Sequence, residues 1–236
     1  MILLLDIGNT LCKWALLDEK QIVEKGFTVI FDACFIESLQ AKGKMFNRII
    51  LSSVRTISES LEDYLRTHFD YQRVETTMTL PLKIAYETPE TLGIDRVMAA
   101  VGASALFPGL PLLIIDAGTA ITIDFVSSNK SFLGGNIAPG MRLRFQALHD
   151  FTDKLPLVSQ KIDFNSMGTT TESAIRAGVQ QGVCNELESY VAKARKQHEN
   201  LQVVLTGGDS LFLSKIIEEK MHLVEDLVFI GMQQLV

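Results

Sequence analysis

The chain has 236 residues, 47% of them hydrophobic and 21% charged, and a formal net charge of −6. Such a composition is ordinary for a globular protein, and the length allows one large or two small domains with a sizeable core. The negative charge, with no block of lysine or arginine, argues against a nucleic-acid partner. No stretch approaches the roughly 18 apolar residues of a membrane helix, so we expect a cytoplasmic protein without a membrane partner.

Cysteine and histidine usage and the N-terminal residues exclude further classes. Cys12, Cys34 and Cys184 are odd in number and widely spaced, which is typical of reduced thiols and not of a disulfide framework. The four histidines are scattered, so a histidine–cysteine metal site is not expected. The apolar run Ile2–Leu5 is too short for a signal peptide, and no basic segment precedes it.

The first half of the chain is predicted to alternate strands and helices. Strands Ile2–Leu5 and Trp14–Leu17 flank a tight turn, and Arg48–Ser52 is a third short apolar run. Helical spacing of apolar residues predicts helices over Ile57–His68 and Gly93–Leu106.

The second half repeats the opening pattern. After the proline-rich LFPGLP, an apolar strand within Leu112–Val126 runs into Asp116 and a glycine turn, as the first strand runs into Asp6. This repetition, together with the strand–helix alternation, predicts an α/β fold that is duplicated and two-lobed, with a central cleft. We expect the lobes to span residues 1–108 and 109–236.

Two later segments continue the alternation. Ser173–Val191 predicts a helix interrupted at Gly178 and Gly182. The run QVVLTGGDS predicts a strand that ends in the turn Gly207–Asp209.

The glycine turns that follow Asp6 and Asp116 favour a phosphate-binding function. Glycine lets a ligand approach the main chain closely, and exposed N–H groups in a turn can hold an anion. A carboxylate beside a phosphate needs a bridging cation, and magnesium binds through one or two carboxylates and the phosphates themselves. One Asp–Gly turn alone more often only connects strands, but two copies and a third Gly–Gly turn favour nucleotide binding. Neither a P-loop nor a Rossmann fingerprint is present.

Six motifs, in a fixed order along the chain, are specific enough to indicate a family. They are DIGNT (Asp6–Thr10), YETPETLGIDR (Tyr86–Arg96), IDAGTAIT (Ile115–Thr122), FLGGNIAPGMR (Phe132–Arg142), GTTTESAIRAG (Gly168–Gly178) and LTGGD (Leu205–Asp209). Together they resemble the type III pantothenate kinases, a family of the acetate and sugar kinase/Hsp70/actin superfamily, over nearly the whole chain.

The resemblance implies a fold and a reaction. The expected fold is the duplicated actin-like, ribonuclease H-like form of the two-lobed architecture. The expected reaction is ATP-dependent phosphorylation of pantothenate to 4′-phosphopantothenate, the first step of coenzyme A biosynthesis. The resemblance also implies Mg-ATP, a monovalent cation (potassium or ammonium), and a homodimer with the pantothenate pocket near its interface.

The resemblance further implies roles for individual residues. Asp95 would be the general base, Asp116 would hold the monovalent cation, and Asp6 would hold the magnesium of Mg-ATP, directly or through water. The expected ATP-binding residues are Asp6, Ile7, Gly8, Asn9, Thr10, Leu11, Cys12, Lys13 and Thr119. The expected substrate-binding residues are Tyr86, Gly93, Ile94, Asp95, Arg96 and Thr171.

Residue type alone supports simpler roles for several of these positions. Asp95 suits the first turn of any helix, Tyr86 suits a packed core, and Thr171 suits a helix N-cap. Lys13 fits a phosphate ligand and an exposed strand residue equally well. Four residues of FLGGNIAPGMR are expected to be loop architecture: Gly134, Gly135, Pro139 and Gly140. Two arginines could meet an anionic substrate or lie at the surface: Arg142 and Arg144.

Two other functions stay open on the sequence. The family includes accessory factors named for effects on transcription, which suggests a non-catalytic regulator. Other superfamily members act on sugars, acetate or polyphosphate. The joint presence of Asp6, Asp95, Arg96 and Asp116 argues against the regulator, and the spacing from Tyr86 to Arg96 argues against another substrate.

Overall fold

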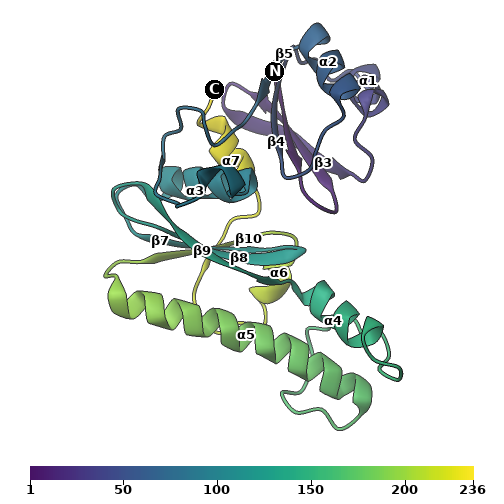
Figure 1. Cartoon of the computed structure of the whole chain (residues 1–236), viewed down its shortest axis with the longest axis vertical. Coiled ribbons are helices and arrows are strands. Elements are labelled where there is room, and N and C mark those ends of the chain that lie inside the picture. Colours follow the sequence, from purple (N-terminus) through teal and green to yellow (C-terminus); the bar gives the residue numbers. More distant parts are fainter. The chain divides into compact units, whose positions relative to one another are not determined.

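Two mixed β-sheets organise the structure, a computed structural model that describes residues 1–236 (Figure 1). One unit consists of residues 1–105 and 227–236, and the other of residues 106–226. The expected lobes, residues 1–108 and 109–236, stay a prediction; the C-terminal helix α7 (Leu227–Gln233) lies in the first of the two units.

The first unit has a sheet with the strand order β3-β2-β1-β4-β5. Strand β1 pairs antiparallel with β2 and parallel with β4, which in turn is parallel to β5. The strands are β1 (Ile2–Ile7), β2 (Cys12–Asp18), β3 (Gln21–Thr28), β4 (Arg48–Ser53) and β5 (Asp70–Arg73), and the two-residue β6 (Lys83–Ile84) follows them in the chain. The helices are α1 (Ala33–Ala41), α2 (Glu59–His68), the short 3₁₀ helix η1 (Pro89–Thr91), α3 (Ile94–Leu106) and α7.

The second unit has strands in the order β11-β10-β7-β8-β9. Strand β7 pairs antiparallel with β8 and parallel with β10, which in turn is parallel to β11. The strands are β7 (Leu112–Ala117), β8 (Ala120–Val126), β9 (Ser131–Pro139), β10 (Gln202–Thr206) and β11 (His222–Leu223). The helices are α4 (Met141–Asp150), α5 (Thr171–Gln197) and α6 (Ser210–Leu213).

Five strands of each sheet share one topology. Read from the edge, β3-β2-β1-β4-β5 in one unit matches β9-β8-β7-β10-β11 in the other, and each matched pair of neighbours has the same relative direction. This agreement confirms the expected duplicated α/β fold.

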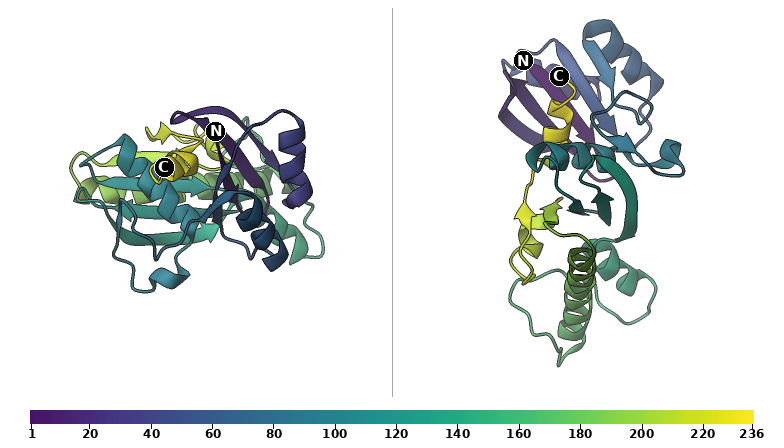
Figure 2. Two further views of the ribbon diagram at one scale, coloured as in Figure 1. Left: turned by 90° about the horizontal axis from the view of Figure 1, so that it is seen from above. Right: turned by 90° about the vertical axis from the view of Figure 1, so that its left-hand side faces the viewer.

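Strand alternation divides each sheet into a core face and a face that carries the hairpin carboxylates. In β1, Leu3 and Leu5 pack with Leu65 of α2 in one hydrophobic cluster, whereas Leu4 and Asp6 point to the other face. The second sheet is divided into the same two kinds of face, and Figures 1 and 2 show α5 lying along its core face. Because the side-chain period is two, a carboxylate one residue after a buried core position lies on the face opposite that core.

Several elements differ from the sequence prediction. Helix α5 is continuous through Gly178 and Gly182, so the expected interruption is wrong. The expected loop at Gly134, Gly135 and Pro139 is also wrong, because all three lie in β9. A Cβ atom at Gly135 would lie 2.2 Å from the Ile123 carbonyl oxygen, so this glycine permits close strand pairing.

Two helix starts show how side chains set the boundaries. Helix α2 begins at Glu59, because the Ser58 hydroxyl caps it by accepting the Leu61 N–H at 3.4 Å. Helix α5 is capped by Thr170, which forms a capping box with Ser173. The expected N-cap role of Thr171 therefore belongs to its neighbour.

Glycines let two helices of the first unit approach closely. A Cβ atom at Gly231 of α7 would lie 1.9 Å from the Met98 carbonyl oxygen, and one at Gly102 of α3 would lie 2.3 Å from the Leu227 carbonyl oxygen. Helix α7 also packs against β1. None of the helices in the structure combines the length and apolar character needed to cross a bilayer.

Candidate active site

The first hairpin places Asp6 at the carboxyl end of β1, on the face opposite the main core. Its neighbours in register are Lys13 on β2 and Ser52 on β4. Side chains in register on adjacent strands share a face, so a carboxylate, an ammonium and a hydroxyl group lie side by side. Ser52 is fully buried, and its hydroxyl has no hydrogen-bond partner within the protein. The sequence prediction did not include Ser52, because only strand register places it beside Asp6.

Other expected ATP ligands of this hairpin differ in what they expose. Asn9 and Thr10 are exposed at the tip, whereas Ile7 and Cys12 point into the core with 1% exposure each. Burial and the nearby charge of Asp6 raise the pKa of the Cys12 thiol to about 12, so it stays protonated at neutral pH. Only the backbone of these two core residues is available to a ligand.

Neither the backbone conformation nor the packing of the protein requires glycine in the two hairpins. Neither Gly8 nor Gly118 has a positive φ, and a Cβ atom would lie 3.4 Å from the Leu11 carbonyl oxygen in the first case and 3.7 Å from the Ala120 carbonyl oxygen in the second. These are ordinary contacts that alanine would tolerate. The missing side chains therefore leave open space beside the turns, which a ligand can use.

The second hairpin brings the Gly207–Asp209 turn beside Asp116. Gly207 has a φ of +96°, and a Cβ atom there would lie 2.4 Å from the Asp116 carboxylate and 2.5 Å from the Ala117 carbonyl oxygen. The Asp209 N–H donates to that same carbonyl at 2.8 Å. Gly140 approaches the turn from another side, with its Cβ position 2.1 Å from the Gly118 carbonyl oxygen.

The donors around Asp116 suit a hard cation. In strand register, Asp116 lies between Thr122 on β8 and Thr206 on β10. Gly207 lies so close to the Asp116 carboxylate that position 207 has no room for a side chain. Oxygen donors of this kind fit potassium or magnesium and not a soft metal. No group of three or more histidine, cysteine, aspartate or glutamate side chains that could hold a metal occurs in the chain.

Asp209 is a further titratable residue beside this hairpin. Burial raises the pKa of its carboxyl group, while a hydrogen bond from Gln160 and the charge of Arg142 act in the opposite direction. Arg142, left open in the sequence analysis, thus lies near a carboxylate. Arg144 has a structural role, because its Nε donates to the Pro139 carbonyl at 2.8 Å and its guanidinium pairs with Glu186.

Asp95 and its neighbours form a cluster at the start of α3. The Arg96 N–H donates to the Asp95 carboxylate at 2.8 Å, and a Cβ atom at Gly93 would lie 2.6 Å from the same carboxylate. Burial raises the pKa of Asp95 despite this hydrogen bond and the charge of Arg96. Arg96 is itself 7% exposed, and its guanidinium lies 5.8 Å from the centre of the Tyr86 ring. The cluster combines a carboxylate of raised basicity with a buried, aromatic-backed positive charge.

The expected residues therefore fall into separate groups. The first unit holds the hairpin around Asp6 and the cluster around Asp95, and the second unit holds the hairpin around Asp116. Thr171 is exposed at the first position of α5. The ligand roles of all these residues stay predictions.

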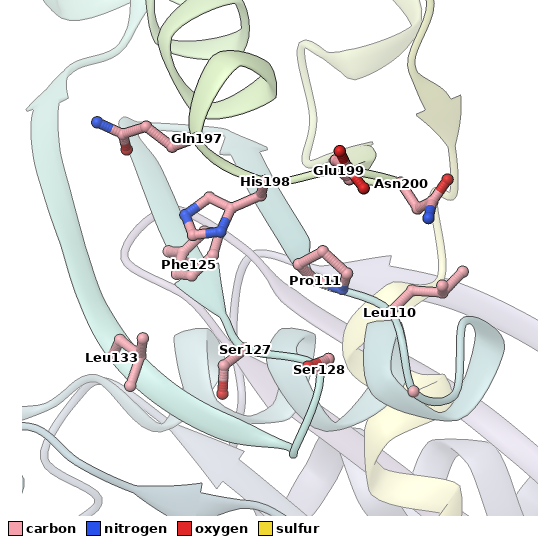
Figure 3. A pocket seen from close by; sticks show the side chains of 11 residues that line it. Leu110, Pro111, Phe125, Ser127, Ser128, Leu133, Gln197, His198, Glu199 and Asn200 are labelled. Carbon is pink, nitrogen blue, oxygen red and sulfur yellow. The ribbon is translucent and has the colours of Figure 1, made fainter.

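A cavity of about 450 Å³ in the second unit contains none of the expected residues (Figure 3). It lies beyond Pro111 at the start of β7, the end of the strand opposite Asp116, and the Phe125 and His198 rings stack there with centroids 4.3 Å apart. We assign it no ligand.

Comparison with solved structures first defines the fold. A solved structure from Campylobacter jejuni, described as a conserved Baf family transcriptional activator, shares the fold with a TM-score of 0.65 and 23% identity, covering 98% of this chain and 96% of that one. This likeness concerns the fold alone, an α/β fold with two mixed sheets.

The sequence comparisons define the family. A family model described as type III pantothenate kinase matches residues 2–193. A type III pantothenate kinase of Phocaeicola vulgatus is 41% identical, covering 89% of this chain and 86% of that protein. A type III pantothenate kinase of Bacteroides fragilis is 38% identical, covering 100% of this chain and 97% of that protein. The chain belongs to the type III pantothenate kinase family, a family of ATP-dependent kinases, and the expected identity is confirmed.

Proposed function

We propose that the protein transfers the γ-phosphoryl group of ATP to the primary hydroxyl of pantothenate, giving 4′-phosphopantothenate for coenzyme A biosynthesis. Besides family membership, the observation that carries this proposal is the cluster of Asp95, Arg96 and Tyr86. It offers a carboxylate of raised pKa next to a buried cation. An acidic substrate with a free hydroxyl needs both groups.

Asp95 acts as the general base in this proposal. A primary alcohol is a weak acid, so the proton leaves late, and the carboxylate first orients the hydroxyl oxygen toward the γ-phosphorus. Its raised pKa makes it a better proton acceptor than an ordinary aspartate. Gly93 supports this position, because a side chain there would displace the carboxylate.

Arg96 and Tyr86 bind pantothenate. The substrate carries one carboxylate, and a buried guanidinium is the side chain that pairs best with a carboxylate. Tyr86 lies under the guanidinium and restricts its orientation. We propose that Gly93 and Ile94 shape the same pocket and that Thr171 contributes a hydroxyl to the substrate.

The first hairpin and Thr119 bind ATP. Backbone N–H groups near Gly8 can approach phosphate oxygens, with the Asn9 and Thr10 side chains beside them. Lys13 adds a positive charge in register with Asp6. Asp6 holds the magnesium of Mg-ATP, directly or through water; bound magnesium neutralises phosphate charge in such reactions.

Asp116 holds a monovalent cation, potassium or ammonium. Its oxygen-rich surroundings support this assignment: the Ala117 carbonyl belongs to the next residue, and two threonines are in strand register with Asp116. One magnesium needs few protein carboxylates, so the second hairpin carboxylate is available for a different ion.

Substituting Gly8 by alanine is expected to weaken ATP binding without affecting folding. A Cβ atom there has only an ordinary contact within the protein but enters the space proposed for phosphate. We expect the KM for ATP to rise about tenfold or more, with an unchanged melting temperature. Gly182→Ala, in α5 where nothing lies within 4 Å of the added atom, is the matched control. An unchanged KM for ATP in Gly8→Ala would remove the hairpin from the nucleotide site.

We also propose that the active protein is a homodimer. Large apolar side chains are exposed in the segment after α4, including Phe151 at 87% and Met167 at 79% exposure. A segment with several exposed large apolar side chains favours a protein–protein contact. Sedimentation at assay concentration is expected to give a dimer, and a fully active monomer would contradict this proposal.

A substrate panel tests the proposed reaction against its alternatives. Purified protein with Mg-ATP and potassium is expected to consume ATP with pantothenate and not with glucose or acetate. Activity with a sugar or acetate alone would favour another kinase of the superfamily. The absence of turnover with every substrate would favour a regulator.

A further inference from the structure

Three buried hydroxyl groups have no hydrogen-bond partner within the protein: those of Ser52, Ser104 and Thr122. A buried hydroxyl left unpaired costs free energy, so each of them needs an explanation. Ser104 lies within α3. Ser52 and Thr122 instead lie in strand register with the two hairpin carboxylates, Asp6 and Asp116.

Thr122 lies directly opposite Asp116 on the antiparallel strand β8. Residues paired in this way share a face of the sheet, with Cβ atoms roughly 4.5–5.5 Å apart. On the other side of Asp116, Thr206 is in register on β10, but its hydroxyl already donates to the Glu225 carbonyl at 3.5 Å. Of the two threonines beside Asp116, only Thr122 has a hydroxyl that no protein group uses.

The duplication of the fold shows what is special about this position. The residue opposite Asp6 in the first hairpin is Lys13, and the residue opposite Asp116 in the second is Thr122. The same place in the two halves therefore holds an ammonium group in one and a neutral oxygen donor in the other. An ammonium next to the first carboxylate opposes binding of a lone monovalent cation there but not of Mg-ATP, whose net charge is negative. A hydroxyl oxygen next to the second carboxylate instead adds a ligand.

We infer that the Thr122 hydroxyl is a ligand of the monovalent cation at Asp116, and that the exchange of lysine for threonine restricts this cation to the second hairpin. The inference rests on the proposed function, in which Asp116 holds potassium or ammonium. Alkali cations are bound by oxygen atoms that replace their hydration shell. A hydroxyl oxygen that is shielded from solvent, unpartnered and beside a carboxylate is suited to that task.

Four variants test the inference. Thr122→Val removes the oxygen at nearly constant shape, Thr122→Ala removes it with no risk of overpacking, and Thr122→Ser retains a hydroxyl. Ser104→Ala is the matched control, because it removes an unpartnered buried hydroxyl that lies in a helix. Each is compared with the wild type by thermal unfolding in potassium chloride and in sodium chloride at equal ionic strength, and by the potassium dependence of phosphorylation.

We expect the wild type, Thr122→Ser and Ser104→Ala to be stabilised by potassium over sodium. Thr122→Val and Thr122→Ala are expected to lose most of that stabilisation and to need at least about tenfold more potassium for half-maximal activity. In sodium, Thr122→Val should be as stable as the wild type, because no satisfied hydrogen bond has been removed, and Thr122→Ala should lose only the packing of one methyl group. A merely structural role would lower stability equally in both salts.

The outcomes distinguish this inference from the proposed function. A full potassium response in Thr122→Val and Thr122→Ala would overturn the role of Thr122 and leave that of Asp116 intact. A wild type that responds equally to potassium and sodium, or an Asp116→Ala variant that keeps the potassium response, would overturn the cation assignment and the inference together. Phosphorylation of pantothenate would stand in either case.

Discussion

Replacing Asp95 with asparagine is expected to lower kcat by roughly 10²- to 10⁴-fold, the usual contribution of a general base. This corresponds to about 3–5 kcal/mol of activation free energy. The affinity for ATP should change little, because Asp95 is assigned to the hydroxyl of the acceptor. Steady-state kinetics with both substrates varied measure these quantities separately.

The stability of the same variant provides an independent check. Burial raises the pKa of Asp95 in the folded protein, so the folded state binds this proton more tightly than the unfolded chain. The ionised carboxylate therefore destabilises the fold above its folded pKa, and this penalty disappears as the pH falls through that value. Asp95→Asn should consequently be as stable as the wild type or more stable at pH 7–8. As the pH is lowered, the wild-type kcat should begin to fall at a higher pH than it would if the general base were an aspartate of ordinary pKa.

An exposed acid at another helix start is the matched control for Asp95. Glu59→Gln removes a negative charge from the first turn of α2, where no ligand role is proposed. It should change stability by less than about 1 kcal/mol and leave kcat unchanged. If Asp95→Asn behaved in the same way, within a few-fold of the wild-type kcat, Asp95 would be only a helix-start residue.

Substituting Gly231 by alanine is expected to give the largest loss of stability. The added Cβ atom would lie 1.9 Å from the Met98 carbonyl oxygen, and backbone on both sides of the contact prevents an easy adjustment. Overpacking of this severity costs about 3 kcal/mol. For a chain of this length that lowers the melting temperature by roughly 6–12 °C. Activity should fall as well, because α3 carries both Met98 and Asp95.

Gly178→Ala is the control for this substitution. It lies in a helix with nothing within 4 Å of the added atom, so alanine should stabilise the protein by roughly 0.5–1 kcal/mol. Thermal unfolding of the two variants side by side tests the close packing of α3 and α7. A Gly231→Ala protein as stable as the wild type would rule that packing out.

The sequence predicted the elements whose signals are local. The two hairpins followed from apolar strands that end at Asp6 and Asp116 with a glycine turn, and the topology confirms that they are copies of one unit. Local signals failed where long-range packing decides. Gly135 looked like a loop residue, but it lies in β9 because β8 approaches too closely for any side chain. Helix α5 continues through Gly178 because a capping box and a long buried face outweigh the cost of the glycines.

The candidate site also has features that the sequence predicted and features that only the structure shows. Family motifs were sufficient to predict Asp95 and Arg96 as functional residues, since both lie within one short segment. The burial that raises the pKa of Asp95 could not be foreseen, because it depends on the surrounding fold. Thr122 was part of a quoted motif, yet its place opposite Asp116 and its unpartnered hydroxyl emerge only from strand register.

Direct detection of the product tests the central claim. Purified protein is incubated with pantothenate, Mg-ATP and potassium, and phosphorus NMR or mass spectrometry identifies what forms. We predict stoichiometric 4′-phosphopantothenate and ADP from the wild type, and a rate lower by at least about 10²-fold from Asp95→Asn. ATP hydrolysis without phosphorylated pantothenate, or equal rates from both proteins, would contradict the account.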